Sequence, residues 1–430
     1  MLNTDRKKIL NLLIWLYRNV YRFLVISIVE ISRKKEVTFH KKKLKDMKKK
    51  KKSVLFIVDD YHVGGVTSFI KQYTQTLTEN NYGVIILGMA GDLTNPETCF
   101  PDCKVIVIPG RLSYSFFGRF VNSLQYLYYI SLLYSRLSTI STVHFGTTLS
   151  TIYCLLHPLT WKKNRVITFY GAYDLERKSK GEKNKFKELM RKYLQYIALK
   201  SSNKIITLSK YAKKIILDNF STEFESKINV IPGFVKVNLL KKYKSKTGSS
   251  IKIVNFGRAE PRKGIDLLLD VSKKLTDNKY KTKTTIASPT IYLYENFDLL
   301  TQYENLNLFT VVNFIHRIDE RQKEYLLKEA DLFVIPSREL ETFGLTILEA
   351  LSNGVLVVGT PVGAIPEILS KIDKRLISKD ISSQSIYDTI VWFINLSNKE
   401  KNELQKKALS VIIKDFSTKK YGKKLLSVYK

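Results

Sequence analysis

The segment from Asp331 to Leu369 constrains the fold more than any other part of the chain. It opens with the apolar run DLFVI, which predicts a buried strand of a parallel sheet that ends at Pro336-Ser337. Gly344 then precedes LTILEAL, whose apolar residues recur at helical spacing. The order strand, turn, helix indicates a ligand site at the carboxyl edge of a sheet. The backbone N–H groups that would face an anion at this helix N-terminus belong to Phe343, Gly344 and Leu345.

Two carboxylates flank this turn. Glu341 precedes the helix and Glu349 follows just over one helical turn after Gly344, so the pair can reach opposite ends of one bound ligand. Carboxylates that bridge hydroxyl groups are suited to sugar recognition. Ordinary exposed carboxylates on a helix are the alternative, and the surrounding Pro336-Ser337 and Phe343-Gly344-Leu345 favour the site.

Short apolar runs alternate with helical stretches along most of the chain. The runs GVIILG, KVIVIP, TVHF, RVITFY and KIITLS are separated by segments such as 185–200 and 210–220. This alternation predicts a doubly wound parallel sheet. A chain of 430 residues is too long for one ordinary core, and two similar α/β domains would fit it.

Each expected domain begins with a strand that leads into a polar or glycine-containing turn. Ser53–Asp59 is followed by Gly64 and Gly65, which let the backbone approach a ligand closely. No third glycine arrives at the spacing of a dinucleotide fingerprint, which argues against a dehydrogenase. In the second domain IKIVNFG leads into a turn that carries Arg258 and Lys263. Two cations five residues apart at such a turn can grip both phosphates of a nucleoside diphosphate, although solvated surface charge is the alternative.

The charge of the chain is strongly basic, with 72 Lys and Arg against 39 Asp and Glu and a net charge of +33. Such a field attracts anionic partners: nucleic acid, anionic lipid or phosphorylated substrates. Residues 1–52 hold a disproportionate share of it. Within them, Ile9–Ile31 has its polar side chains in one sector, which favours a helix in a membrane interface. The run 41–52 predicts a linker or a polybasic lipid contact.

Three other interpretations of Ile9–Ile31 stay open. A spanning helix would place two arginines near its middle, and a helix packed on the first domain would bury the same apolar face. The third interpretation is a cleaved signal peptide, but the apolar region of this segment is interrupted by charge and no small-residue cleavage site follows it. Three cysteines and few histidines give neither a disulfide framework nor zinc-ligand spacing, so we expect a cytoplasmic protein without a metal.

The string ETFGLTILEA, together with the turns described above, resembles the signature of glycosyltransferase family 4, over about Ser53 to Lys430. This resemblance implies the GT-B architecture, α/β with two Rossmann-like domains facing across a cleft, and a retaining transfer from a nucleotide-sugar. It implies that Glu341 holds the hydroxyls of the donor sugar and Glu349 the ribose, while Arg258 and Lys263 bind the diphosphate without a metal. It also implies that the Gly64-Gly65 loop borders the donor phosphates and the acceptor.

Several positions depart from the family pattern. Tyr170 stands where the family usually has a histidine beside the reacting sugar, and a tyrosine can donate a hydrogen bond but does not titrate near neutrality. His316 replaces a more usual glycine in the segment that would line the base pocket. The resemblance implies that this pocket is contacted by backbone groups of His316, Arg317 and Ile318.

The sequence therefore predicts a retaining hexosyltransferase that acts from a nucleoside-diphosphate sugar on a glycan or lipid-linked acceptor, peripheral on the inner face of an anionic membrane, with no nucleic-acid partner. The alternative is a basic, non-catalytic binding protein on the same scaffold. We expect a membrane-associating segment, an acceptor domain, a hinge, a donor domain and a C-terminal helix that packs back on the acceptor domain. Their respective bounds are 1–52, 53–240, 241–250, 251–415 and 416–430.

Overall fold

The computed structural model of the chain describes residues 52–61, 64–91, 95–111, 116–154, 157–179, 183–235, 250–288 and 297–430. The expected membrane segment 1–52, apart from Lys52, lies outside these ranges, and so does the expected hinge 241–250, apart from Ser250. Within the described ranges, no helix is both long enough and apolar enough to cross a membrane.

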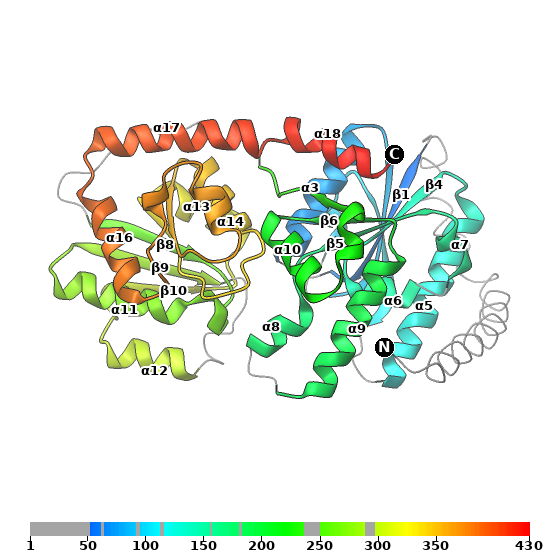
Figure 1. The fold of residues 1–430 in the computed structure, drawn as a ribbon, viewed down its shortest axis with the longest axis horizontal. Helices are drawn as coiled ribbons and strands as arrows, with labels where there is room; N and C mark the ends of the chain where they lie inside the picture. The colour runs from blue at the N-terminus through cyan, green and yellow to red at the C-terminus, as the bar shows by residue number, and fades with distance from the viewer. Residues whose placement is uncertain are drawn as a thin grey trace. The chain divides into compact units, whose positions relative to one another are not determined.

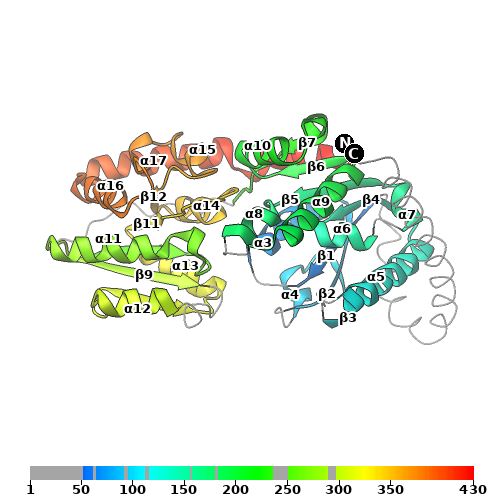
Figure 2. The ribbon, with the colours of Figure 1, turned by 60° about the horizontal axis from the view of Figure 1, so that its bottom comes forward.

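The first sheet has seven strands in the order β3-β2-β1-β4-β5-β6-β7, and Figure 2 shows them from β3 at the bottom to β7 at the top. All pairings described among β1 to β5 are parallel. The chain runs outward from β1 to β3 and then adds β4 on the other side of β1, so a topological switch point lies between β1 and β4. The strands are β1 (Ser53–Asp60), β2 (Gly83–Ala90), β3 (Lys104–Arg111), β4 (Ile140–Phe145), β5 (Asn164–Phe169), β6 (Lys204–Thr207) and β7 (Ile228–Val230).

Helices follow these strands in alternation. Val54, Leu55, Phe56 and Ile57 of β1 are fully buried, as expected for a central parallel strand covered on both faces. The helices of this part of the chain are α3 (Gly65–Glu79), α4 (Pro96–Cys99), α5 (Phe116–Arg136), α6 (Thr148–Cys154), α7 (Pro158–Trp161), α8 (Tyr173–Ser179), α9 (Lys185–Ser201), α10 (Lys210–Asn219) and the 3₁₀ turn η2 (Thr222–Lys227).

The second sheet repeats this plan with five strands in the order β10-β9-β8-β11-β12, all parallel. The chain moves outward from β8 to β10 and returns to place β11 beside β8. The switch point of this sheet therefore lies between β8 and β11. The strands are β8 (Ile251–Phe256), β9 (Thr282–Ser288), β10 (Val312–His316), β11 (Leu332–Ile335) and β12 (Leu356–Gly359).

Helices cover both faces of the second sheet. Figure 1 shows α11 and α12 on one side of β8–β10 and α13 and α14 on the other. Asp319 and Gln322 form a capping box that fixes the start of α13. The elements are η3 (Pro261–Lys263), α11 (Ile265–Asp277), α12 (Phe297–Asn305), α13 (Glu320–Glu329), α14 (Leu345–Ser352), α15 (Ile365–Leu369), η4 (Lys374–Leu376), α16 (Ser383–Asn395), α17 (Asn398–Asp415) and α18 (Thr418–Val428).

The chain forms two compact units. One holds the described residues through Thr168 together with Leu194–Ile205 and Val428–Lys430, and the other holds Phe169–Tyr193 and Ile206–Ser427. This division passes through α9 and β6, whereas the predicted domain bounds follow the two sheets, and those bounds stay a prediction. The predicted α/β class with two doubly wound parallel sheets is confirmed.

The last residues of the chain pack on the first sheet. The hydroxyl of Tyr429 lies 2.5 Å from Nδ1 of the buried His144, whose Nε2 lies 2.8 Å from Oγ1 of Thr168. The side-chain amide of Asn164 donates to the carbonyl of Val428 at 3.0 Å. The C-terminus is therefore held by hydrogen bonds to β4 and β5.

Candidate active site

The switch point of the second sheet brings two turns together. The turn after β8 carries Arg258 and Lys263, and the turn after β11 carries Glu341. Gly264 ends the first turn with φ +64°, and a Cβ there would lie 2.0 Å from the carbonyl oxygen of Pro336. Only glycine permits both this backbone conformation and this approach, so Gly264 is what lets the two turns meet.

Lys263 and Glu341 are in direct contact at this point. The Nζ of Lys263 lies 2.6 Å from Oε2 of Glu341, and the hydroxyl of Ser337 donates to the same oxygen at 3.2 Å. Glu341 is buried. Burial alone would raise the pKa of this carboxyl, but Lys263, Arg262 and the Ser337 hydroxyl lower it below its usual range. Glu341 is therefore a charged acceptor at neutral pH.

The backbone of Glu341 is fixed by the segment after β12. Gly363 has φ +59°, and a Cβ there would lie 2.2 Å from the carbonyl oxygen of Glu341. The N–H of Ala364 donates to that oxygen at 2.9 Å. Because these contacts hold the main chain, the carboxylate of Glu341 is positioned before any ligand arrives.

A second ion-pair group orders the turn after β8. One carboxylate oxygen of Glu260 lies 2.9 Å from Nη1 of Arg258, and the other accepts from Nε of Arg262 at 2.9 Å. Arg262 is buried, and its main-chain carbonyl accepts from the N–H of Arg338 at 2.8 Å. The Arg258 side chain is 44% exposed, so its guanidinium can still bind an anion from solvent.

The helix α14 supplies the remaining polar groups of the site. Gly344 precedes it with φ +79°, which places the N–H groups of the first turn at the carboxyl edge of β11. Glu349 lies one turn further along, and its Oε2 is 2.5 Å from Nζ of Lys323 on α13. Lys323 thus joins α13 to α14.

The chain matches two family models that together span most of its length. Residues 63–239 match the model described as Glycosyltransferase Family 4, and residues 238–411 match Glycosyl transferases group 1. The chain is a glycosyltransferase of the family 4 type. The predicted family and the predicted enzyme class are confirmed.

Relatives and solved structures agree with this family. An uncharacterized glycosyltransferase of Methanocaldococcus jannaschii is 22% identical over 393 residues, which are 86% of this chain and 95% of that protein. One component of the human phosphatidylinositol N-acetylglucosaminyltransferase is 27% identical over 316 residues, 72% of this chain and 61% of that one. The structure of Anabaena HepE in complex with UDP and glucose superposes with a TM-score of 0.70 at 15% identity, covering 88% of this chain and 98% of that one. This likeness shows that the glycosyltransferase has the GT-B fold.

Three further predicted residues of the glycosyltransferase lie at the end of β10. His316 is the last residue of that strand, and Arg317 follows with φ +52°. The N–H of Ile318 donates to the carbonyl of Ser288 at 3.1 Å. A positive φ at a residue other than glycine is strained and frequently marks functional turns. The segment therefore belongs to the same carboxyl edge of the second sheet as the turns described above.

The other predicted residues belong to the part of the glycosyltransferase around the first sheet. Tyr170 directly follows β5 and is partly exposed. Gly64 precedes α3 and Gly65 begins it, and a Cβ on either glycine would meet no atom within 4 Å. The backbone at Gly64 and Gly65 is thus unobstructed, and its role beside the donor phosphates stays a prediction.

Three residues that form ion pairs with the predicted site residues or next to them were not indicated by the sequence, namely Glu260, Arg262 and Lys323. The alternation of charges in the turn from Arg258 to Lys263 could have indicated the ion pairs of Glu260. No local signal indicates Lys323, because its partner Glu349 is distant in sequence. Within the described residues, no group of three or more His, Cys, Asp and Glu side chains could hold a metal ion.

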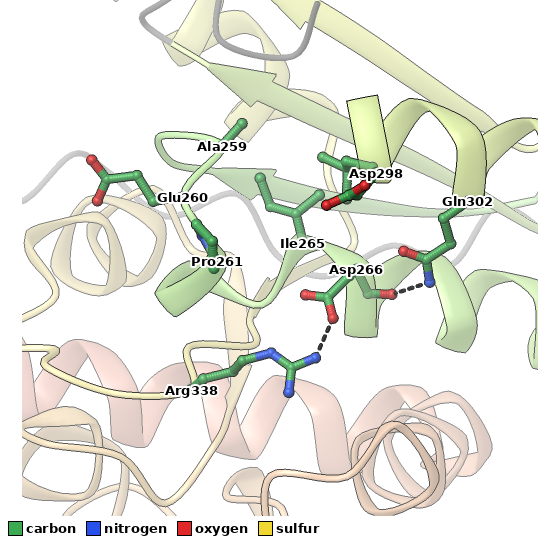
Figure 3. Close-up of a pocket in the computed structure, with 9 residues that line it drawn as sticks. Ala259, Glu260, Pro261, Ile265, Asp266, Asp298, Gln302 and Arg338 are labelled. Atoms are coloured by element: carbon green, nitrogen blue, oxygen red, sulfur yellow. Dashed lines mark hydrogen bonds and ion pairs between the residues drawn. The ribbon is translucent and has the colours of Figure 1, made fainter. Parts of the chain in front are cut away.

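A pocket of about 390 Å³ is lined in part by the Arg258–Lys263 turn (Figure 3). Arg338 forms an ion pair with Asp266 at its rim, and the side-chain amide of Gln302 donates to the carbonyl of Asp266 at 3.1 Å. Its lining consists of Ala259, Glu260, Pro261, Ile265, Asp266, Asp298, Leu299, Gln302 and Arg338.

Proposed function

We propose that this glycosyltransferase moves a hexose from a nucleoside-diphosphate sugar to a hydroxyl of a glycan or lipid-linked acceptor, with retention of the anomeric configuration. The observation that carries the proposal is the contact between Lys263 and Glu341 at the switch point of the second sheet, beside the N-terminus of α14. It joins a cation suited to a diphosphate to a charged carboxylate suited to sugar hydroxyls.

The chemistry requires charge stabilisation more than acid–base catalysis. The bond between the anomeric carbon and the β-phosphate oxygen breaks, and a bond to the acceptor oxygen forms on the same face. The acceptor proton passes to the departing phosphate. Arg258, Lys263 and the N–H groups of Phe343, Gly344 and Leu345 would offset the charge that grows on this phosphate. Glu341 would hold the sugar, and Glu349 the ribose.

A structural neighbour that was solved with UDP favours uracil as the base. Anabaena HepE was solved with UDP and glucose and also with UDP-glucose. In this chain we assign the contacts with the base to backbone groups of His316, Arg317 and Ile318. Arg258 and Lys263 supply two positive charges for the diphosphate, so we propose that the donor binds without a metal ion.

The acceptor is assigned to the surface of a membrane. The human relative is named for phosphatidylinositol, and residues 1–52 of this chain are basic and apolar in the manner of an interfacial anchor. We therefore place the enzyme as a peripheral protein on the inner face of an anionic membrane.

The test is a panel of nucleotide-sugars and bare nucleotides measured by thermal unfolding and by release of free nucleotide. A ligand at 100 times its dissociation constant adds roughly 2.7 kcal/mol to the free energy of unfolding. We expect protection by one class of nucleotide-sugar, with release of the nucleoside diphosphate when acceptor membranes are added. Protection by nucleic acid and by no nucleotide-sugar would replace this proposal with the basic binding protein.

A further inference from the structure

The first turns of α9 expose large apolar side chains to solvent. Phe186 is 72% exposed, Leu189 64% and Met190 40%. Their spacing of three and four residues places them on one face of the helix. Single exposed apolar residues are ordinary, but a contiguous group on one face marks an interaction surface.

Tyr173 of α8 is a further exposed apolar residue and contacts Arg191, which follows Met190 on α9. Tyr173 is 42% exposed, and its ring lies under two guanidinium groups, with the Cζ of Arg177 at 5.4 Å and that of Arg191 at 5.6 Å from the ring centroid. Arg177 also donates to the tyrosine hydroxyl at 3.1 Å. The contact with Arg191 ties α8 to α9, which Figures 1 and 2 show side by side. We call Tyr173, Phe186, Leu189 and Met190 the α8–α9 patch.

Basic residues flank the members of the α8–α9 patch along the chain. Residues 183–192 hold five cations and one carboxylate, Glu188, which gives this short segment a net charge of +4. The lysines at 183, 185 and 187 are exposed. An apolar centre with a basic rim is complementary to the interface of a bilayer that contains anionic lipid, where apolar side chains enter and lysines meet head groups.

A second copy of the chain fits this surface poorly. In a two-fold dimer the same patch would face itself, and the two basic rims would repel each other. A bilayer with anionic head groups instead supplies the opposite charge over the whole rim. The charge pattern therefore favours lipid as the occupant.

We propose that the α8–α9 patch docks on anionic membranes, with Phe186 and Leu189 inserted at the level of the upper acyl chains. This surface is separate in sequence from residues 1–52. The proposal depends on the proposed function in one respect only, namely that the acceptor is borne by a membrane. Two separate contacts with one bilayer would fix the orientation of the protein, as one tail could not.

The test places a tryptophan in the patch of the full-length protein. Phe186→Trp is compared with Phe309→Trp, because Phe309 is a similarly exposed aromatic residue elsewhere, at 59%. Fluorescence is recorded with vesicles of phosphatidylglycerol and phosphatidylcholine brominated on the acyl chains, and the signal of the native tryptophans is subtracted with the parent protein. We expect emission from Trp at position 186 to shift to the blue and to lose at least half its intensity, while emission from position 309 stays unchanged.

Two outcomes overturn the proposal directly. One is vesicle-bound protein in which the fluorescence at position 186 is not quenched, and the other is no binding of the full-length protein to anionic vesicles. If position 186 is instead shielded from acrylamide without vesicles, and the mass in solution is that of a dimer, the occupant is a second copy.

A second pair of variants measures affinity. Phe186→Ser with Leu189→Ser should lower the partition coefficient on anionic vesicles at least fivefold, and Phe309→Ser with Ile413→Ser, which removes two comparably exposed apolar side chains, should leave it unchanged. Equal partition of both variants and the parent overturns the proposal. Binding of UDP without vesicles should be the same in all three proteins, and its absence from all three would count against the proposed function and not against the docking surface.

Discussion

The Nζ of Lys263 lies 2.6 Å from Oε2 of Glu341, so the residue assigned to the diphosphate and the residue assigned to the sugar form one ion pair. The pair joins the turn after β8 to the turn after β11. Burial raises the pKa of the Glu341 carboxyl, and the charge of Lys263 lowers it below its usual range. A change at either residue therefore alters the charge balance at the other. The two assignments are therefore tested together.

Replacing Lys263 by Ala should weaken nucleoside diphosphate binding by roughly 1.5–3 kcal/mol, the range for a hydrogen bond to a charged group. It should also lower the thermal midpoint, because the buried Glu341 carboxylate loses its cation. Calorimetry measures the affinity, and Lys273→Ala on the exposed face of α11 is the control. Unchanged affinity in a folded Lys263→Ala protein would remove this lysine from the diphosphate site.

The two glutamates should separate binding from transfer. Glu341→Ala should reduce hexose transfer far more than it reduces the affinity for bare nucleotide, since this carboxylate is assigned to the sugar. Glu349→Ala should also weaken the binding of bare nucleotide, because the carboxylate of Glu349 is assigned to the ribose. Nucleotide titration and a transfer assay on both variants check this, and parent-like nucleotide affinity in both would require another residue for the ribose.

The sequence predicts which residue types gather at the second sheet, but not how they pair. Lys263 and Glu341 belong to turns that follow recognisable strands, so topology alone brings them to one edge. Their direct contact depends on Gly264, whose φ of +64° and close approach to Pro336 are properties of the folded chain. The partnership of Glu349 with Lys323 likewise links two helices through long-range packing that no local pattern encodes.

Tyr170→Phe should lower turnover modestly and leave the shape of the pH–rate profile unaltered. The expectation follows if the phenol only orients the sugar, since a tyrosine does not titrate near neutrality. Steady-state rates from about pH 5.5 to 9 on parent and variant decide it. Loss of a titrating limb in the variant would show that the hydroxyl takes part in proton transfer.

Removing residues 1–52 should leave nucleotide-sugar binding intact and abolish most activity on a membrane-borne acceptor. The reason is that each basic residue near an anionic surface contributes about 1 kcal/mol, in addition to the apolar face of 9–31. Flotation with anionic and neutral vesicles at low and high salt measures the loss. Equal flotation of truncated and full-length protein would rule out this segment as an anchor, and resistance of the full-length protein to both high salt and alkaline carbonate would indicate a spanning helix.

His144 should make the folded state less stable as the pH falls below neutrality. Burial lowers its pKa from 6.5 to about 3, so the unfolded chain takes up a proton that the folded chain does not. The free energy of unfolding then decreases as pH falls from about 6.5 towards 3, by up to roughly 1.4 kcal/mol for each pH unit. The buried His157, whose pKa is lowered to about 4, acts in the same direction. Denaturant melts of the parent at pH 7 and pH 5 should show the decrease.

Two variants separate the titration of His144 from its hydrogen bonds. His144→Gln removes the titrating group, so the difference between pH 7 and pH 5 should shrink by about 2 kcal/mol. Tyr429→Phe removes only the hydroxyl that lies 2.5 Å from Nδ1 of His144. It should lower stability by a similar amount at both pH values, because the imidazole stays buried and still cannot take up a proton. A pH dependence in His144→Gln equal to that of the parent would show that other groups cause it.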